Sequence, residues 1–336
     1  MISTIDVARG WEHALEDLGH KVHAFEYHCR IAFFDRLYRS LQDLELMGPV
    51  PNEVLVNVAV DGLCSRIVEF APDLAVIVTG LLLPRRAYLW LQRLGVPTAL
   101  ILTESPYNDE RQSELCQWVD VVFTNDRSSL ARLKKFNERT FYLPHSYDPH
   151  QHKPGPTVPE KAHDVYFMGT MYPERKALFD AVNWGEADAL IVGTSLNKDG
   201  TIEGQPQTNE ELVELYRSAR ICPQMHRTTA DYFEGTVIGE DAYSLGPRVY
   251  EVLACGGGML LCDDSRQELY DCFTVGKDCE TFSGPEELGD KARYYLAHEG
   301  ERRRIVESGL KAVQPHSFVE RARRVVIPAL EECDAW

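Results

Sequence analysis

Short apolar runs alternate along the chain with segments whose hydrophobic residues recur about every 3.6 positions. In the first 150 residues the apolar runs are KVHAFEY, LAVIVTG, TALILTE, VDVVFTN and TFYLPH, and a helical pattern follows each of them. Apolar strands that alternate with amphipathic helices are typical of a parallel sheet covered by helices. The pattern therefore predicts a Rossmann-like α/β domain over residues 1–150.

The alternation stops in HSYDPHQHKPGPTVPEKAH, residues 145–163, which contains four prolines. A stretch this rich in proline is typical of a linker. Beyond it the alternation restarts with DVYFMG, DALIVG, ARICPQM and GMLLCD, and two long helical patterns close the chain. We therefore expect a second α/β domain over residues 151–316, followed by a terminal helix over 317–336.

The first domain lacks the strand with which a Rossmann-like domain usually begins. The chain starts almost at once in the helical pattern IDVARGWEHALEDLGH. Either the first strand is absent, or Met1 is a late start and upstream residues belong to the fold. A sheet without its central strand would leave backbone groups unpaired, so something must fill that place.

Composition narrows the function classes. The longest apolar run, LAVIVTGLLLP, ends at Pro84 and is shorter than the roughly 18 residues that a membrane span needs. With no signal-peptide pattern at the start, we expect a cytoplasmic protein. The nine cysteines contain no C-x-x-C pair and are expected to pack as small hydrophobic residues. The net charge of -17 disfavours nucleic acid as a partner but leaves it open as an acceptor.

Candidate chemistry is concentrated in GPRVYEVLACGGGMLLCDD, residues 246–264. Gly246 and Pro247 can start a short helix, and the three glycines that follow Cys255 can stop it by allowing positive φ and close approach of another backbone. The helix start suits an anion such as a diphosphate, and Glu251, one turn in, could hold two ribose hydroxyls. Alternatively, Glu251 only favours the helix dipole and the glycines form a loop.

This stretch resembles the E-A-x-A-C-G-x-P-V segment of the group 1 glycosyltransferases, and more closely the R-x-x-E-x-L-A-C-G-G form of their spore-maturation (CgeB-like) branch. The similarity continues through residues 263–309 and the closing HSFVERARRVV. The resemblance implies the GT-B fold, in which two Rossmann-like domains face each other across a cleft and the C-terminal helix crosses back.

The resemblance also implies a nucleotide-sugar site in the second half. It would be built from backbone amides after a strand, a basic pair, the turn after the next strand, a strand end facing the cleft, and the start of the short helix. The corresponding residues are Gly169 and Thr170, Arg175 and Lys176, Gly193 and Thr194, His226 and Arg227, and Gly246, Arg248 and Glu251. Arg175 and Lys176 could instead lie on a solvated helix face, and His226 could be an ordinary surface or core histidine.

The chain departs from the family pattern E-x-x-x-x-x-x-x-E, in which the first glutamate contacts the donor sugar. Tyr243 stands at that position, and the nearby Glu240 and Asp241 could substitute for the glutamate. In the first half, Glu104 follows a strand and could orient or deprotonate an acceptor hydroxyl, or it could only cap the next turn. We therefore take Glu104, Arg175 and His226 as catalytic candidates.

We expect no metal site, because the histidines at positions 145, 150 and 152 have no acidic or cysteine partner at ligand spacing. The resemblance implies a metal-independent, retaining glycosyltransferase that uses a nucleoside diphosphate sugar as donor and needs no other cofactor. Its acceptor is unidentified and could be a protein, a polysaccharide, a modified nucleic-acid base or a metabolite. The alternatives are a sugar-nucleotide epimerase on the same fold and a non-catalytic nucleotide-binding module.

Overall fold

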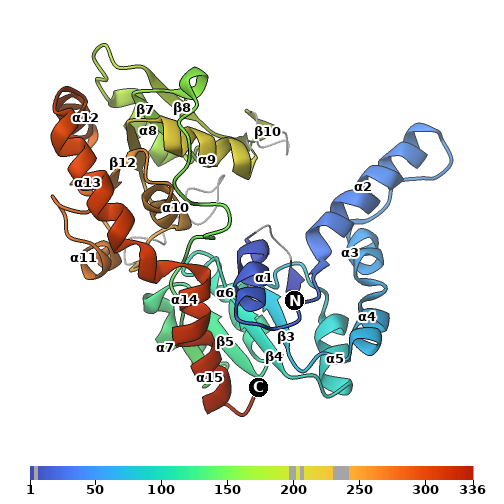
Figure 1. Ribbon diagram of the computed structural model, residues 1–336. Coiled ribbons are helices and arrows are strands. Elements are labelled where there is room, and N and C mark those ends of the chain that lie inside the picture. The colour runs from blue at the N-terminus through green and yellow to red at the C-terminus, as the bar shows by residue number, and fades with distance from the viewer. Residues whose placement is uncertain (4–6, 197–201, 205–207, 230–241, 336) are drawn as a thin grey trace. The chain divides into compact units, whose positions relative to one another are not determined.

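The structure is a computed structural model that describes residues 1–3, 7–196, 202–204, 208–229 and 242–335 (Figure 1). The chain divides into two compact units. The first unit comprises Met1–Leu143 together with Ala322–Trp336, and the second comprises Pro144–Arg321. The last segment thus belongs to the first unit, as expected of a helix that crosses back. The unit boundaries lie after residues 143 and 321, whereas the sequence predicted domain boundaries at residues 150 and 316.

The first unit contains a six-stranded sheet of order β2-β1-β3-β4-β5-β6, in which all the pairs are parallel. Every residue of β3, β4 and β5 is buried, as expected for a parallel sheet with helices on both faces. The strands are β1 (Ile2–Ser3), β2 (Phe25–Glu26), β3 (Ala75–Val78), β4 (Thr98–Ile101), β5 (Val121–Thr124) and β6 (Thr140–Tyr142).

The helices of the first unit follow the predicted alternation with its strands. They are α1 (Ala8–Asp17), α2 (Tyr27–Asp43), α3 (Asn52–Val60), α4 (Leu63–Phe70), α5 (Arg85–Arg93), α6 (Asp109–Cys116), the short turns η1 (Arg127–Ser129) and α7 (Leu130–Leu133), and the terminal η5 (Ala322–Val326) and α15 (Ile327–Glu332). No helix in the described part of the chain is both long and apolar enough to cross a bilayer.

A first strand is present in the structure, but it is only two residues long. Strand β1 lies between β2 and β3, where Ile2 pairs with Phe25 on one side and Ile77 on the other. The terminal amine of Met1 donates a hydrogen bond to the carbonyl of His23 at 2.7 Å. A very short strand therefore fills the central place and pairs the backbone groups there.

The second unit contains a five-stranded sheet of order β13-β12-β11-β7-β8, again with parallel pairs throughout. A small antiparallel pair, β9 with β10, lies outside it. The strands are β7 (Val165–Met168), β8 (Ala189–Val192), β9 (Ser195–Leu196), β10 (Ile202–Glu203), β11 (Ile221–Gln224), β12 (Met259–Asp263) and β13 (Glu280–Phe282).

The helices of the second unit pack around this sheet (Figure 1). They are η2 (Pro159–Lys161), α8 (Pro173–Ala181), α9 (Asn209–Ser218), α10 (Pro247–Cys255), α11 (Gln267–Cys272), α12 (Pro285–Ala297), α13 (Glu299–Ala312), η4 (Gln314–His316) and α14 (Phe318–Arg321).

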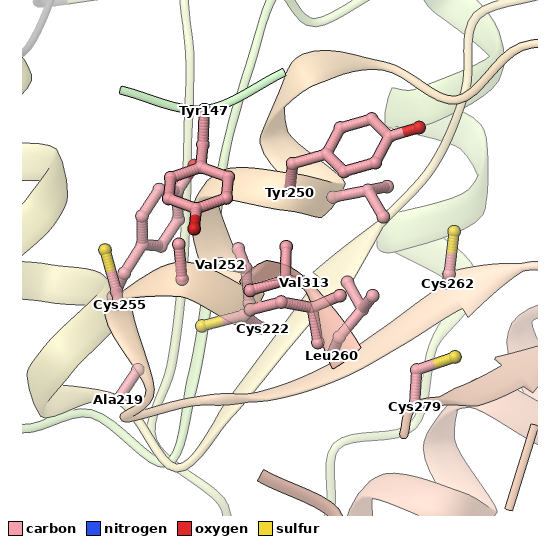
Figure 2. Close-up of a cluster of buried hydrophobic side chains, with 14 of the residues drawn as sticks. Tyr147, Ala219, Cys222, Tyr250, Val252, Cys255, Leu260, Cys262, Cys279 and Val313 are labelled. Carbon is pink, nitrogen blue, oxygen red and sulfur yellow. The ribbon is translucent and has the colours of Figure 1, made fainter. Parts of the chain in front are cut away.

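Cysteines contribute to the core of the second unit, as predicted. Figure 2 shows Cys222, Cys255 and Cys262 among Tyr250 and Leu260, with their sulfur atoms in the buried cluster. All nine cysteines are free thiols. Burial raises the pKa of Cys255 to about 12, so this thiol stays neutral and packs as a small apolar group.

The three glycines after α10 have separate structural causes. Gly256 ends the helix with φ of 65°, a conformation that favours glycine. A Cβ on Gly257 would lie 2.2 Å from the carbonyl oxygen of Arg217, and one on Gly258 would lie 2.3 Å from the Sγ of Cys222. The predicted close approach of another backbone is confirmed at Gly257.

Candidate functional site

The candidate residues of the second unit gather at one edge of its sheet. Gly169 follows β7, Gly193 follows β8, His226 lies just beyond β11, and Asp263 ends β12. Because these strands are parallel, their carboxyl ends share the edge at which open α/β sheets bind ligands. The geometry therefore brings together segments that lie up to 94 residues apart in the sequence, from position 169 to position 263.

The start of α10 lies against the imidazole of His226. Gly246 precedes the helix and Pro247 occupies its first turn, and no side chain caps the helix start. A Cβ on Gly246 would lie 3.8 Å from Cδ2 and 4.0 Å from Nε2 of His226. The positive end of the α10 dipole and the Nε2 edge of the ring therefore face the same space.

A carboxylate that we did not predict holds His226. Oδ2 of Asp263 accepts hydrogen bonds from the main-chain N–H of His226 at 2.7 Å and from Nδ1 at 2.6 Å. Burial alone would raise the pKa of this carboxyl, but His226 and the hydrogen bonds from Ser265 outweigh burial and hold the pKa well below its ordinary value. Asp263 is therefore an anion at neutral pH.

Arg175 lies at the edge of the sheet where β7 and β11 end. Its Nε donates to the carbonyl of Met225 at 2.9 Å, and Nη1 donates to the carbonyl of Thr170 at 2.9 Å. Burial lowers its pKa to about 10, and the nearby guanidinium groups of Arg248 and Arg227 act in the same direction. The side chain still carries its charge at neutral pH, so three cations lie close together.

Two residues brace this cluster from α8 and the turn before it. The hydroxyl of Tyr172 accepts a hydrogen bond from Nη1 of Arg227 at 2.6 Å, with the guanidinium carbon 5.5 Å from the centre of the ring. Oε1 of Glu174 accepts from the main-chain N–H of Thr228 at 3.1 Å and from the hydroxyl of Thr229 at 3.0 Å. These contacts fix the backbone that follows His226.

Arg248 and Glu251 lie one turn apart on α10. Nη1 of Arg248 donates to the hydroxyl of Tyr216 at 3.0 Å, and Nη2 contacts the Sδ of Met168 at 3.6 Å. Burial alone would lower the pKa of Arg248, but Tyr216 and Glu251 outweigh burial and raise it above its ordinary value. Glu251 is half-buried, and no described residue hydrogen-bonds its carboxylate. Its two oxygens are thus available acceptors beside a cation.

Gly193 packs against the carbonyl of Gly169, and this contact explains why position 193 is a glycine. A Cβ on Gly193 would lie 1.9 Å from the carbonyl oxygen of Gly169. The turn is further fixed by a hydrogen bond of 3.0 Å from the N–H of Met171 to the carbonyl of Thr194. Thr170 is exposed next to this contact.

Lys176 is placed apart from the three arginines. Its ammonium forms an ion pair with Asp180 at 2.6 Å, and its side chain is 65% exposed. The sequence left open that both basic residues lie on a solvated helix face. In the structure this holds for Lys176 but not for Arg175.

Tyr243 is linked to α11 by two hydrogen bonds. Its hydroxyl bonds to the carboxylate of Asp271, and its carbonyl accepts from the N–H of Glu268 at 3.1 Å. The two acidic residues suggested as substitutes, Glu240 and Asp241, lie outside the described residues.

Glu104 lies in the first unit, just beyond β4. Its N–H donates to the side chain of Gln112 at 3.3 Å, and its carbonyl accepts from the N–H of Asn108 at 3.0 Å. The next residue, Ser105, is held by two hydrogen bonds to the side-chain amide of Asn125, at 3.0 and 2.9 Å. The position of Glu104 at the carboxyl edge is thus firmly built.

A cavity of about 520 Å³ also lies in the first unit, but at the other edge of the sheet. Its lining includes Met1 and Ala75, which stand at the amino-terminal ends of β1 and β3, together with Phe70 and Leu91. Ligands of open α/β sheets bind at the carboxyl edge, so we do not assign this cavity to donor or acceptor.

One group of possible metal ligands occurs within the described ranges. It consists of His226, Cys262 and Asp263, whose ligand atoms lie within 4.8 Å of one another. Nδ1 of His226 and Oδ2 of Asp263 are already hydrogen-bonded to each other, and burial raises the pKa of Cys262 well above its ordinary value. Because a thiol binds metal as the thiolate, the group suits a hydrogen-bonded pair better than a metal.

Comparisons with known proteins agree with this architecture. Residues 174–326 match the model of the family described as glycosyl transferase-like. Spore protein CgeB of Bacillus subtilis (strain 168) is 19% identical over 261 residues, which cover 74% of this chain and 80% of CgeB.

Two solved structures share the fold. A glycosyltransferase from Rickettsia africae superposes with a TM-score of 0.52 at 11% identity, covering 98% of this chain and 97% of its own. HepE of Anabaena, solved in complex with UDP and glucose, gives 0.53 at 12% identity, with 80% and 81% covered. The chain therefore has the GT-B fold, and its residues 174–326 are similar to the glycosyl transferase-like family.

Proposed function

We propose that the protein transfers a glycosyl group from a nucleoside diphosphate sugar to an acceptor hydroxyl. The observation that carries the proposal is that Arg227 and Arg248 both act electrostatically on Arg175, while Arg248 and the ring of His226 lie at the start of α10. A bound anion beside the positive end of the α10 dipole would relieve the repulsion of Arg175 by the two other guanidinium groups, and a diphosphate supplies that charge.

The same cations suit the chemistry of transfer. As the bond between the anomeric carbon and the β-phosphate oxygen breaks, its electron pair remains on the diphosphate, and the fixed arginines stabilise that charge. The acceptor oxygen forms the new bond to the anomeric carbon. In the retaining, metal-independent course that the resemblance implies, the departing phosphate takes the acceptor proton, so Glu104 would orient the acceptor rather than serve as an obligatory base.

Glu251 would bind the ribose of the nucleotide. Its half-buried carboxylate has no hydrogen-bond partner within the described ranges and lies one turn beyond the helix start that would hold the phosphates. Two acceptor oxygens match two vicinal hydroxyls, and each charge-assisted hydrogen bond contributes about 1.5–3 kcal/mol.

Nucleotide binding is measured first and glycosyl transfer second. Wild-type protein is screened by thermal shift and calorimetry against UDP, ADP, GDP and their glucose conjugates, and we expect one of these bases to bind. Glu251→Gln should weaken that binding by about tenfold or more, since most of one charge-assisted bond is lost. Glu307→Gln, the same change on the exposed face of α13, is the matched control and should bind like wild type.

Equal nucleotide affinity of Glu251→Gln and Glu307→Gln would contradict the role of Glu251.

Incubating the protein with the donor that it binds then distinguishes a transferase from an epimerase and from a binding module. Transfer of the sugar to water or to an added acceptor supports a transferase, an isomerised sugar in the absence of acceptor indicates an epimerase, and tight binding with no turnover indicates a binding module.

A further inference from the structure

The ring of His226 is held more firmly than an ordinary histidine. Its side chain is 8% exposed and that of Asp263 is 13% exposed. One oxygen, Oδ2 of Asp263, accepts from both the main chain and the ring of the same residue. The backbone and the imidazole are therefore tied to a single point, which leaves the ring little freedom to rotate.

The carboxylate is itself fixed in place. Its second oxygen, Oδ1, accepts from the N–H of Ser265 at 3.2 Å and also bonds to the hydroxyl of Ser265. Asp263 is the last residue of β12, which pairs with β11 along the whole of that strand. The anchor of the imidazole is thus part of the sheet rather than part of a loop.

This anchoring decides which ring nitrogen is available. A carboxylate at Nδ1 requires a proton on that nitrogen, so the other nitrogen, Nε2, is presented outward. Nε2 lies 4.0 Å from where a Cβ on Gly246 would stand, at the start of α10. No described residue hydrogen-bonds Nε2. This edge of a largely buried ring therefore lies next to the positive end of a nine-residue helix.

We propose that Asp263 is a positioning residue that holds His226 so that its Nε2–H donates a hydrogen bond to the diphosphate of the donor. This inference rests on the proposed function. In the bound state both ring nitrogens donate, Nδ1–H to Asp263 and Nε2–H to the diphosphate. No proton transfer is required: His226 donates a hydrogen bond as charge builds up on the leaving diphosphate, and Asp263 acts only through His226.

The test compares binding of a nucleoside diphosphate with binding of its nucleoside. For whichever of UDP, ADP or GDP binds wild type, affinities are measured by calorimetry with Asp263→Asn, His226→Gln and the double variant. Each single change should weaken diphosphate binding about tenfold and leave nucleoside binding unchanged. The double variant should be no weaker than the weaker single variant, because residues that act as one unit are not additive.

Asp264→Asn is the matched control. It makes the same change at the adjacent, exposed residue, so diphosphate binding should stay within about twofold of wild type. Circular dichroism of every variant without ligand checks that each is folded.

Several results would overturn the inference. Additive losses in the double variant would show that Asp263 acts independently of His226. Equal losses for nucleoside and diphosphate would show that the pair only supports the fold, and loss of binding on chelation with EDTA would make the pair metal ligands. If wild type binds no nucleoside diphosphate, the proposed function fails as well. If wild type binds one and Asp263→Asn binds it with the same affinity, only this inference fails.

Should Asp263→Asn fail to fold, histidine-selective ¹⁵N labelling of wild type gives the same answer. We expect Nδ1 of His226 to be protonated and the Nε2 resonance to move when the diphosphate is added. An Nε2 resonance that stays in place at saturation would overturn the inference.

Discussion

Gly257→Ala tests the contact that sets the position of α10. The added methyl would lie 2.2 Å from the carbonyl oxygen, 2.5 Å from Cα and 2.6 Å from the carbonyl carbon of Arg217. All three atoms belong to the backbone of α9, so no side chain can rotate away. The hydrogen bond of 2.9 Å from the N–H of Gly258 to the carbonyl of Tyr216 holds the two segments together at the same place.

The methyl therefore forces α9 and the turn after α10 apart by about 1 Å, the shortfall from an ordinary contact. Overpacking of this kind costs about 1–3 kcal/mol. The lower conformational entropy of the unfolded chain offsets only about 0.4–1 kcal/mol of this cost. We expect a net loss of about 1–2 kcal/mol in the free energy of unfolding, and weaker nucleotide binding because α10 carries Arg248 and Glu251.

Urea unfolding of the full chain measures the stability change. Gly300→Ala is the control, because a Cβ there meets no atom within 4 Å, and the change lies in α13. That variant should be as stable as wild type or gain up to about 1 kcal/mol. If Gly257→Ala unfolded at the same urea concentration as Gly300→Ala, the backbone contact would not exist in solution and the reasoning would be refuted.

Two further predictions concern buried charges. Arg266 is 1% exposed and donates to the carbonyls of Ala242 and Arg227 at 3.1 and 2.8 Å. Arg266→Met should therefore lower the free energy of unfolding in urea by about 2–4 kcal/mol. An unchanged unfolding midpoint would show that these hydrogen bonds contribute nothing to stability. The lowered pKa of Asp263 means that its contribution is fully present above its unfolded pKa of about 3.8 and is lost as pH falls toward the folded value. The difference in unfolding free energy between wild type and Asp263→Asn, about 2 kcal/mol at pH 7, should therefore shrink below about pH 4, and a constant difference from pH 7 to pH 3 would contradict this.

The sheets were predictable because strand formation here is a local signal. The runs LAVIVTG, TALILTE and VDVVFTN became β3, β4 and β5, since short, mostly apolar runs that are covered on both faces have few alternatives. The helix stop at Gly256 was equally local, because positive φ favours glycine. The two-residue β1 was not predictable, since its pairing depends on strands that follow it by more than 20 residues.

The partner of His226 was hidden for a different reason. Asp263 lies 37 residues further along the chain, and only the pairing of β11 with β12, in which Gln224 is opposite Cys262, brings the two together. A sequence shows that MLLCDD ends in acidic residues, but it does not show which strand lies alongside. Pairing order, rather than composition, decided which of several polar strand ends face one another.

The basic pair illustrates the limit set by helix geometry. Arg175 and Lys176 are adjacent in the sequence, but successive residues on a helix point about 100° apart, so a single edge of the sheet can receive only one of them. Arg175 turns inward to the carbonyls of Met225 and Thr170, and Lys176 pairs with Asp180 in solvent. A family motif of two basic residues therefore need not mean two phosphate ligands. In this chain the second and third cations of the cluster come instead from Arg227, beyond β11, and Arg248, on α10, which surround the helix start from different elements of the fold.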